Sequence, residues 1–323
     1  MADLTSTEID IDQLKADFGD YYIDQKQNMD NLHLLPFESF DTRDAFTIVP
    51  TDNTELRESN VEFESILQQY QDEFTPKGSV TFKPRRIELF QMKIDQHFNP
   101  TKLQRSWVAF LSSNKLERAD WPFVRWMIEV YLMKQSMEDM EKFAIHNGVY
   151  EAPIEGVAGD PSKTMNGVNK LIVDAEAAGE LDFINTGALS ATPSTFVTQV
   201  EDFVKAWPEK YRRMGIVINM SRTLEERFVE GMQTKYNMQY AQVGQLKSVR
   251  NFENVTVAGR PSLEGKSRIW GTPKYNAIMG VKGFENTNAF KIESSKRFVD
   301  IFSDWWAGIG FINYEIFFCN EQA

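Results

Sequence analysis

The stretch that decides the fold lies at residues 120–148 and reads DWPFVRWMIEVYLMKQSMEDMEKFAIHNG. Its apolar residues recur at every third or fourth position, which places them on one face of an α-helix. They are Phe123, Trp126, Met127, Val130, Met133, Met137, Met140 and Ala144. Asp120 is expected to cap the helix, Pro122 to lie in its first turn and Asn147-Gly148 to end it. We predict an amphipathic spine helix of about 25 residues, about 37 Å long, whose methionines fill the core.

Downstream of this helix the pattern indicates a mixed α+β fold. Helices are expected at 168–178, ended by Gly179, from a Ser194 or Thr195 cap to Pro208, and from a Ser221 cap to Tyr236. Strands are expected at 216–220, 254–258, 277–281, 289–293, 297–302 and 311–318. Between the last two, residues 304–308 are expected to turn. Trp305 and Trp306 would pack this turn on the spine helix, with a ligand platform as the alternative.

Upstream of the spine helix the chain has little apolar surface of its own. Residues 1–55 carry small aromatic clusters without a sustained period, which is typical of an arm that docks elsewhere or of a partly disordered tail. A short helix is expected at 61–71. Residues 79–83 and 87–94 alternate apolar and polar around Pro84-Arg85-Arg86. They predict a projecting two-stranded feature that needs a neighbour for stability.

The charge is concentrated at one end of the 323-residue chain, whose net charge is −12. Residues 1–75 hold 18 acidic and 4 basic side chains, whereas the remaining residues hold 29 and 31. No basic stripe is evident, so tight sequence-specific nucleic-acid binding is not expected. The sequence contains no apolar run long enough to span a membrane. Its acidic start is unlike a signal peptide, which favours residence in the cytoplasm.

Residues that could hold a metal or attack a substrate are few. The single cysteine, Cys319, lies in an apolar run and is expected to be a small buried hydrophobic residue. The histidines are His33, His97 and His146, which are too far apart in sequence for typical zinc-ligand spacing. They also offer little for a Ser/His or Cys/His nucleophile. We therefore predict no catalytic and no metal-binding residue.

Two further patterns suggest chemistry but have structural explanations. The loop 156–164, GVAGDPSKT, approaches a phosphate-binding motif, yet Ser162 and Val157 stand where that motif requires glycine. We interpret it as a surface loop and predict no cofactor. The pair Glu225-Glu226 falls at an expected helix start, where negative charge is favourable. That placement explains the pair better than acid/base catalysis.

Several stretches, in this order, resemble the major capsid proteins of tailed phages (Caudoviricetes), especially those of phages of Bacteroidetes. They are FKPRRIEL at 82–89, KID at 93–95, WVAFL at 107–111, WPFV at 121–124, AIHNGVY at 144–150, GVNKLIVDA at 167–175, EKYR at 209–212, FVDIF at 298–302 and DWWAGIGF at 304–311. The resemblance covers residues 56–323. None of the stretches is a catalytic signature, so it is their order that carries the resemblance.

The resemblance implies an α+β HK97-like phage capsid fold. Its parts would be an N-terminal arm (1–55), an extended loop region (56–105), a peripheral domain with the spine helix and C-terminal strands (106–150 and 285–323) and an axial domain (151–284). It also implies hexamers and pentamers in an icosahedral shell around double-stranded DNA, within a virion assembled in the host cytoplasm. Portal, scaffold and decoration proteins are the implied partners. A near-neutral body suits such a container.

Contacts between subunits are then the expected site. We expect Lys83, Arg85 and Arg86, at the tip of the extended loop, to meet acidic residues of a neighbouring subunit, and Phe37 of the arm to dock on one. The alternative is a solvated basic turn. No Lys–Asn pair stands out for covalent crosslinking.

Three other functions remain open at this stage. An encapsulin-type nanocompartment shell protein has the same fold, and the neighbouring genes would distinguish it from a phage protein. A soluble α+β enzyme would use scattered carboxylates and stay monomeric. A minor virion component, such as a decoration or tail protein, would differ in its stoichiometry within the particle.

Overall fold

The fold was analysed in a computed structural model, which describes residues 41–118, 120–237, 246–282, 290–295 and 297–321, apart from the side chains of 59–63, 81, 83 and 295. The predicted spine helix is confirmed. It runs without interruption through α4 (Phe123–Arg125), a π-helical segment (Trp126–Leu132), α5 (Met133–Asp139) and a second π-helical segment (Met140–Ala144).

The start of the spine helix differs from the prediction. Pro122 is the N-cap residue and makes no side-chain cap bond, while Asp120 is exposed and contributes only its carbonyl, which accepts a hydrogen bond from Arg125 Nη1 at 2.7 Å. Phe123, Trp126 and Met133 are buried on the face that the apolar spacing predicted, and Ile128, outside that face, is buried as well. The methionine stripe is core, as expected.

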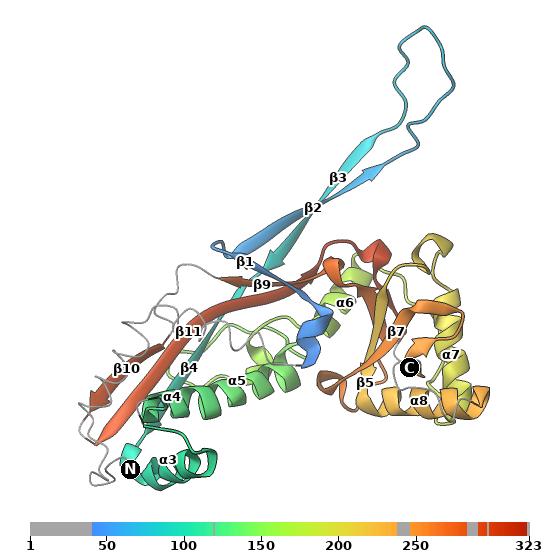
Figure 1. The fold of residues 1–323 in the computed structure, drawn as a ribbon. Coiled ribbons are helices and arrows are strands. Elements are labelled where there is room, and N and C mark those ends of the chain that lie inside the picture. The colour runs from blue at the N-terminus through green and yellow to red at the C-terminus, as the bar shows by residue number, and fades with distance from the viewer. Residues whose placement is uncertain (1–40, 119, 238–245, 283–289, 296, 322–323) are drawn as a thin grey trace.

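One sheet lies beside the spine helix (Figure 1). It runs in the order β1 (Thr47–Thr51), β9 (Ala277–Lys282), β11 (Phe298–Phe311), β10 (Phe290–Ser295), and β4 (Phe90–Phe98) also pairs with β11. Strand β11 therefore has three antiparallel partners along its 14 residues. Strand β1, in the predicted arm, pairs in parallel with β9.

The expected turn at 304–308 is absent. Because β4 pairs with β11 from Val299 to Ala307, the chain stays extended through both tryptophans. Trp305 is buried and Trp306 is half-buried, and successive strand residues face opposite sides, so they form no common platform. The expected strand at 311–318 is also wrong, because a 3-10 turn (Tyr314–Ile316) precedes the short β12 (Phe318–Cys319).

A second sheet has the order β12, β8 (Trp270–Pro273), β5 (Ile216–Ser221), β7 (Phe252–Arg260), β6 (Ser248–Val249). Helices α7 (Pro193–Lys205) and α8 (Arg222–Tyr236) pack together beside it, while α6 (Val168–Ala177) lies nearer the first sheet (Figure 1). The Ser221 cap is confirmed, since its hydroxyl accepts from Leu224 N. Helix α7 begins two or three residues earlier than expected, with Thr192 as N-cap residue.

The two sheets exchange strands across the expected domain boundary at residue 284. Strand β9 precedes that boundary but belongs to the first sheet, whereas β12 follows it and belongs to the second. Two connections therefore link the sheets in addition to the segment that follows the spine helix. The residues of each sheet are therefore not continuous in the chain.

The projecting feature is a hairpin of β2 (Glu55–Phe63) and β3 (Val80–Glu88), paired from Glu55↔Glu88 to Phe63↔Val80 (Figure 1). Its loop is 64–79, so the helix expected at 61–71 and the turn expected at Pro84-Arg85-Arg86 are both wrong. Pro84 fits within β3 because a two-stranded sheet has outer edges where its missing N–H is harmless. After Leu89 the chain continues directly into β4.

A further helix, α3 (Pro100–Asn114), lies between β4 and the spine helix and was not predicted. Asn99 caps it by accepting from Thr101 N, and Pro100 occupies its first turn. Lys115, at a φ of 54°, ends it. The Asn99-Pro100 pair was the available sequence signal.

Glycines allow the base of the hairpin to cross the first sheet. A Cβ at Gly308 would lie 2.0 Å from Glu88 O, and one at Gly310 would lie 2.5 Å from Ile87 Cγ1. The backbone of the β3–β4 junction therefore rests directly on β11. A side chain at Gly308 would push the two strands apart.

We expect Gly308→Ala to lower the free energy of unfolding by about 3 kcal/mol or more, because the clash is with backbone that has no rotamer to change. Urea denaturation measures this. Gly215→Ala is the control, since a Cβ there meets nothing within 4 Å, and we expect it to change stability by less than about 0.5 kcal/mol. Equal stability of the two variants would contradict the close crossing.

Candidate functional site

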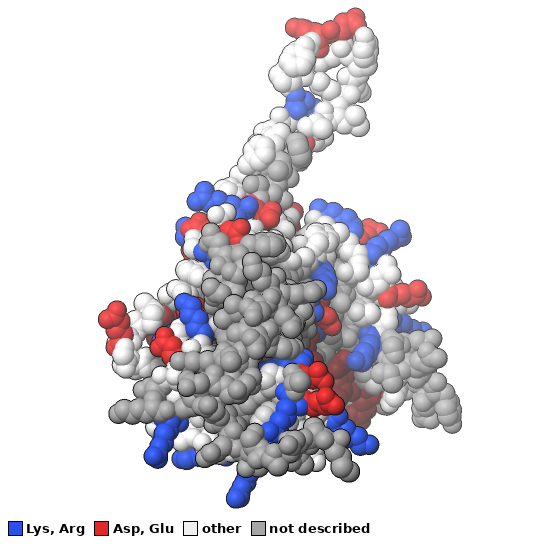
Figure 2. Space-filling view, turned by 60° about the vertical axis from the view of Figure 1, so that its left-hand side comes forward, with Lys and Arg blue, Asp and Glu red and all other residues white. Residues whose placement is uncertain are grey.

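The hairpin loop exposes large apolar side chains far from the body. Leu67 is 85% exposed, Tyr70 91% and Phe74 92%, and Ile66 is also exposed. Figure 2 shows acidic side chains gathered at the same far end, where Asp72 and Glu73 are exposed. We call this segment, residues 64–79, the tip. An exposed apolar cluster on a narrow projection is a typical contact surface.

The tip has internal hydrogen bonds although it has no regular secondary structure. Gln68 Nε2 donates to Thr75 O at 2.7 Å, and Lys77 Nζ donates to Leu67 O at 2.6 Å. Gly78, at a φ of 85°, returns the chain to β3. These bonds preorganise the loop for binding, which reduces the conformational entropy that it would lose on binding a partner.

The basic residues expected at the tip lie at the base of the hairpin instead. Arg85 Nη1 donates to Glu180 Oε2 at 2.5 Å, and its guanidinium lies 5.0 Å from the centroid of the Tyr314 ring. Arg86 pairs with Glu55 and Glu88, each at 2.8 Å. Burial raises the pKa of Tyr314 to about 12, so this ring stays neutral beside Arg85.

The other two expected contact residues are less defined. Lys83 pairs with Asn60 in the hairpin, but its side chain lies outside the described residues. Phe37 also lies outside them. The structure thus brings Arg85 and Arg86 together with partners of their own chain and leaves the roles of Lys83 and Phe37 as predictions.

The described part of the predicted arm is fixed by a buried polar cluster. Thr42 donates its backbone N–H to Glu141 Oε2 at 3.2 Å, and its hydroxyl also bonds Glu141 and lies 2.9 Å from Ser262 Oγ. Arg260 donates to Asp41 O and to Asn219 Oδ1, at 2.5 and 2.8 Å. These bonds join residues 41–45 to the spine helix and to the second sheet. The remainder of the arm, 1–40, lies outside the described residues.

His146 lies fully buried where the spine helix ends. Its Nε2 accepts a hydrogen bond from Trp270 Nε1 at 3.1 Å, while its Nδ1 has no partner within the part of the chain that is described. Burial, with a smaller contribution from the positive Arg260, lowers the pKa of His146 to about 3. The imidazole is therefore a neutral core group.

We expect acid to destabilise the fold through His146. Its pKa is lower in the folded than in the unfolded chain, so below about pH 6.5 only the unfolded chain gains this proton, and stability falls as the pH falls. Between pH 7 and 5.5 the loss is about 1 kcal/mol. Chemical denaturation at both pH values measures it.

His146→Gln keeps a hydrogen-bond acceptor for Trp270 and should remove that loss. His97→Gln should retain it, because His97 is exposed and lies beside Asp300. A loss of equal size in all three proteins would contradict the assignment to His146.

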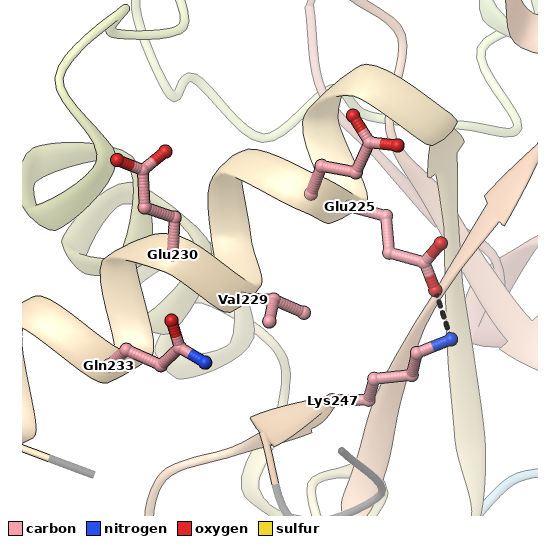
Figure 3. Close-up of a pocket in the computed structure, with 6 residues that line it drawn as sticks. Glu225, Val229, Glu230, Gln233 and Lys247 are labelled. Atoms are coloured by element: carbon pink, nitrogen blue, oxygen red, sulfur yellow. Dashed lines mark ion pairs between the residues drawn. The ribbon is translucent and has the colours of Figure 1, made fainter. Parts of the chain in front are cut away.

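The carboxylates of α8 line an open groove of about 370 Å³ (Figure 3). Glu225 Oε1 accepts from Lys247 Nζ at 2.7 Å, and Glu230 and Gln233 lie one to two turns along the helix. Glu225 lies in the first helical turn, as predicted. The helix dipole and the ion pair explain these charges without a reaction.

The other chemical candidates have structural roles. Asp160 accepts from Ser162 N at 2.8 Å and begins a 3-10 turn, so the 156–164 segment is a surface loop as predicted. Cys319 is buried, as predicted, and burial raises its thiol pKa to about 12. Across the described residues no group of three or more His, Cys, Asp or Glu could hold a metal, and no helix has the length and apolarity to cross a membrane.

The sequence matches no protein-family model and no curated protein. The structure, however, is similar to a chain of the satellite phage P4 procapsid that includes the size determination (Sid) protein. The TM-score is 0.61 at 15% identity, over 97% of this chain and 98% of that chain. This chain shares the fold of that procapsid chain.

Two further solved structures agree. A chain of the capsid of Myoviridae phage XM1 gives a TM-score of 0.54 at 11% identity, over 88% of this chain and 91% of that one. A chain of the capsid of an empty GTA particle gives 0.52 at 12% identity, over 87% and 89%. The similarity therefore spans nearly whole chains, and at these identities it lies in the fold.

The exposed apolar side chains of the tip were not predicted from the sequence. Ile66, Leu67 and Tyr70 have a spacing that suggested a helix face, so their exposure was not foreseen. The available signal was their setting among glutamines and acidic residues next to Pro76 and Gly78, which disfavours a buried helix.

Proposed function

We propose that this chain is the major capsid subunit of a tailed phage of the kind found in Bacteroidetes hosts. Copies would assemble into hexamers and pentamers of an icosahedral head around double-stranded DNA. The protein would act by assembly rather than by catalysis. The observation that carries this proposal is the apolar tip, held at the end of a hairpin that has no cover in the described part of the chain.

The physical argument starts from the isolation of the hairpin. A two-stranded sheet is marginally stable alone in water, and β2–β3 pairs with no third strand among the described elements. Burying Leu67, Tyr70 and Phe74 against another molecule would stabilise the contact by about 2 kcal/mol for each side chain. Since a shell presents the same surfaces on every copy, a second copy is the natural partner.

The HK97-like assignment adds roles to the parts of the chain. Residues 1–55 would be the arm, 56–105 the extended loop region, 106–150 with 285–323 the peripheral domain and 151–284 the axial domain. Phe37 and Lys83 would contact a neighbour, alongside Arg85 and Arg86. Portal, scaffold and decoration proteins would complete the virion, which would assemble in the host cytoplasm.

We expect a Leu67→Ser, Tyr70→Ser, Phe74→Ser variant to fold normally but to form no particles. Its unfolding free energy should change by less than about 0.5 kcal/mol, because these side chains contact little in the single subunit. Circular dichroism and urea denaturation report folding, and negative-stain microscopy with size-exclusion chromatography reports assembly.

A Gln69→Ser, Gln71→Ser variant is the matched control, since both residues lie in the same tip and are exposed. It should assemble like the wild type. Wild-type yields of particles from the apolar variant would overturn the proposed function, as would a wild-type protein that remains monomeric at high concentration with all auxiliary proteins present.

Arg86 gives a second test at the base of the hairpin. Its side chain is 58% exposed, and exposed ion pairs contribute little to stability. Arg86→Glu should therefore leave the subunit folded although it loses the pairs with Glu55 and Glu88, while it repels acidic residues of the neighbour and reduces particle yield by tenfold or more. Arg85 is a poorer probe, because its side chain is only 21% exposed and its pair with Glu180 in the same chain is therefore less screened by solvent.

Arg57→Glu makes the same charge change on the paired strand, directly across from Arg86, and should assemble normally. Sedimentation of the products compares the two variants. Normal particles from Arg86→Glu would rule out the contact at this residue.

A further inference from the structure

Helix α3 has two unlike faces. One face carries Trp107 and Leu111, which are buried against the spine helix in a cluster with Phe123 and Trp126. The other face is exposed along the whole helix. Its residues, apart from Ala109 and the terminal Asn114, are basic or carry hydroxyl groups: Thr101, Lys102, Arg105, Ser106, Ser112 and Ser113.

The exposed face carries positive charge only. No Asp or Glu occurs between residues 96 and 116, and Lys115 adds a positive charge directly after the helix, before Glu117. Lys102, Arg105 and Lys115 form no ion pair with any described residue, whereas on the spine helix Arg125 is paired with Glu129. We call the exposed residues 101–113 together with Lys115 the α3 face.

The position of the α3 face separates it from the proposed subunit contact. In Figure 1 the helix lies at the end of the body opposite the hairpin. In Figure 2, which keeps the same vertical axis, the charged side chains that protrude at this lower end are Lys and Arg. The α3 face is therefore far from the tip, where we propose that a neighbour binds.

We propose that the α3 face contacts the phosphate backbone of duplex DNA inside the shell. Lys, Arg, Ser and Thr are the side chains that most often contact phosphates, and Lys102 and Arg105 lie one helical turn apart, so both can reach one strand. The face lacks the aromatic anchors that protein contacts generally use. This inference rests on the proposed function, because the shell supplies the enclosed DNA.

Few charges per subunit make the contact weak. Three or four phosphates neutralised would give a slope of about −3 for log K against log salt concentration. The weak contacts of many subunits with one enclosed DNA molecule would add up, although no single subunit would bind the DNA tightly. The absence of a basic stripe from the sequence as a whole is consistent with this, since the α3 face is short.

The test measures binding of a fluorescent 20-base-pair duplex to full-length unassembled subunits by anisotropy, from 0.02 to 0.2 M NaCl. The variant is Lys102→Gln with Arg105→Gln. We expect it to bind on the order of tenfold more weakly at the lowest salt, with a slope nearer zero by about two units. The control, Lys266→Gln with Lys274→Gln, removes the same charge from exposed residues elsewhere and should match the wild type.

Particle formation is measured on the same proteins, which separates this inference from the proposed function. Normal shells with weaker DNA binding only in the α3 variant support the inference. Equal binding by variant and control, or no binding by the wild type at 0.02 M NaCl, overturns it while the shell proposal stands. Loss of shells in the α3 variant with unchanged DNA binding also overturns it, and would assign the face to a protein contact.

Discussion

The close approach of two backbones at β11 is the constraint on which the rest of the structure depends. Gly308 lets the backbone of β11 meet the Glu88 carbonyl of the chain that descends from the hairpin, and Gly310 leaves the space that the Ile87 side chain fills. That chain then continues as β4 along β11, and the spine helix packs beside both. The hairpin is thus an extension of a core strand, which explains how a narrow two-stranded projection can be held in a defined direction.

The body combines this close approach of β11 and the β3–β4 junction with a hydrogen-bonded junction between its two sheets. Glu141 at the end of the spine helix, Arg260 at the end of β7 and Thr42 of the N-terminal segment share one buried set of hydrogen bonds. Buried polar groups are costly unless they are paired. The junction therefore forms as a whole, and it fixes the place from which the N-terminal segment leaves the body.

Local signals in the sequence were sufficient for most helices and for the overall class. The Ser221 cap, the stop at Gly179 and the apolar repeat of residues 123–144 each act within a few residues, so they could be predicted. The strand through Trp305 could not, because its extended form depends on pairing with β4, which lies about 200 residues away. The turn expected at Pro84 is likewise absent, because β3 stays extended through Pro84 where it pairs with β2.

The candidate site was only partly predictable for the same reason. Exposure of Leu67 and Tyr70 is a property of the whole fold, since it depends on the fact that no described element packs against the hairpin loop. Arg85 was expected at the tip of the extended loop but lies at the base of the hairpin, and its ion pair with Glu180 depends on how α6 ends beside β3. The α3 face was hidden in the sequence because its charges are few and become a single surface only when the helix forms.

The length of the hairpin has a mechanical consequence. Nine residues of extended strand span about 30 Å, so a tilt of about 10° at the hairpin base would displace the loop by about 5 Å. The hairpin would bend at its base, where Arg85 pairs with Glu180 and where Gly308 and Gly310 of β11 contact the chain. In the proposed shell of hexamers and pentamers, neighbouring copies would meet at more than one angle, and bending at the hairpin base would let the same apolar loop reach its binding surface in both settings without repacking the body.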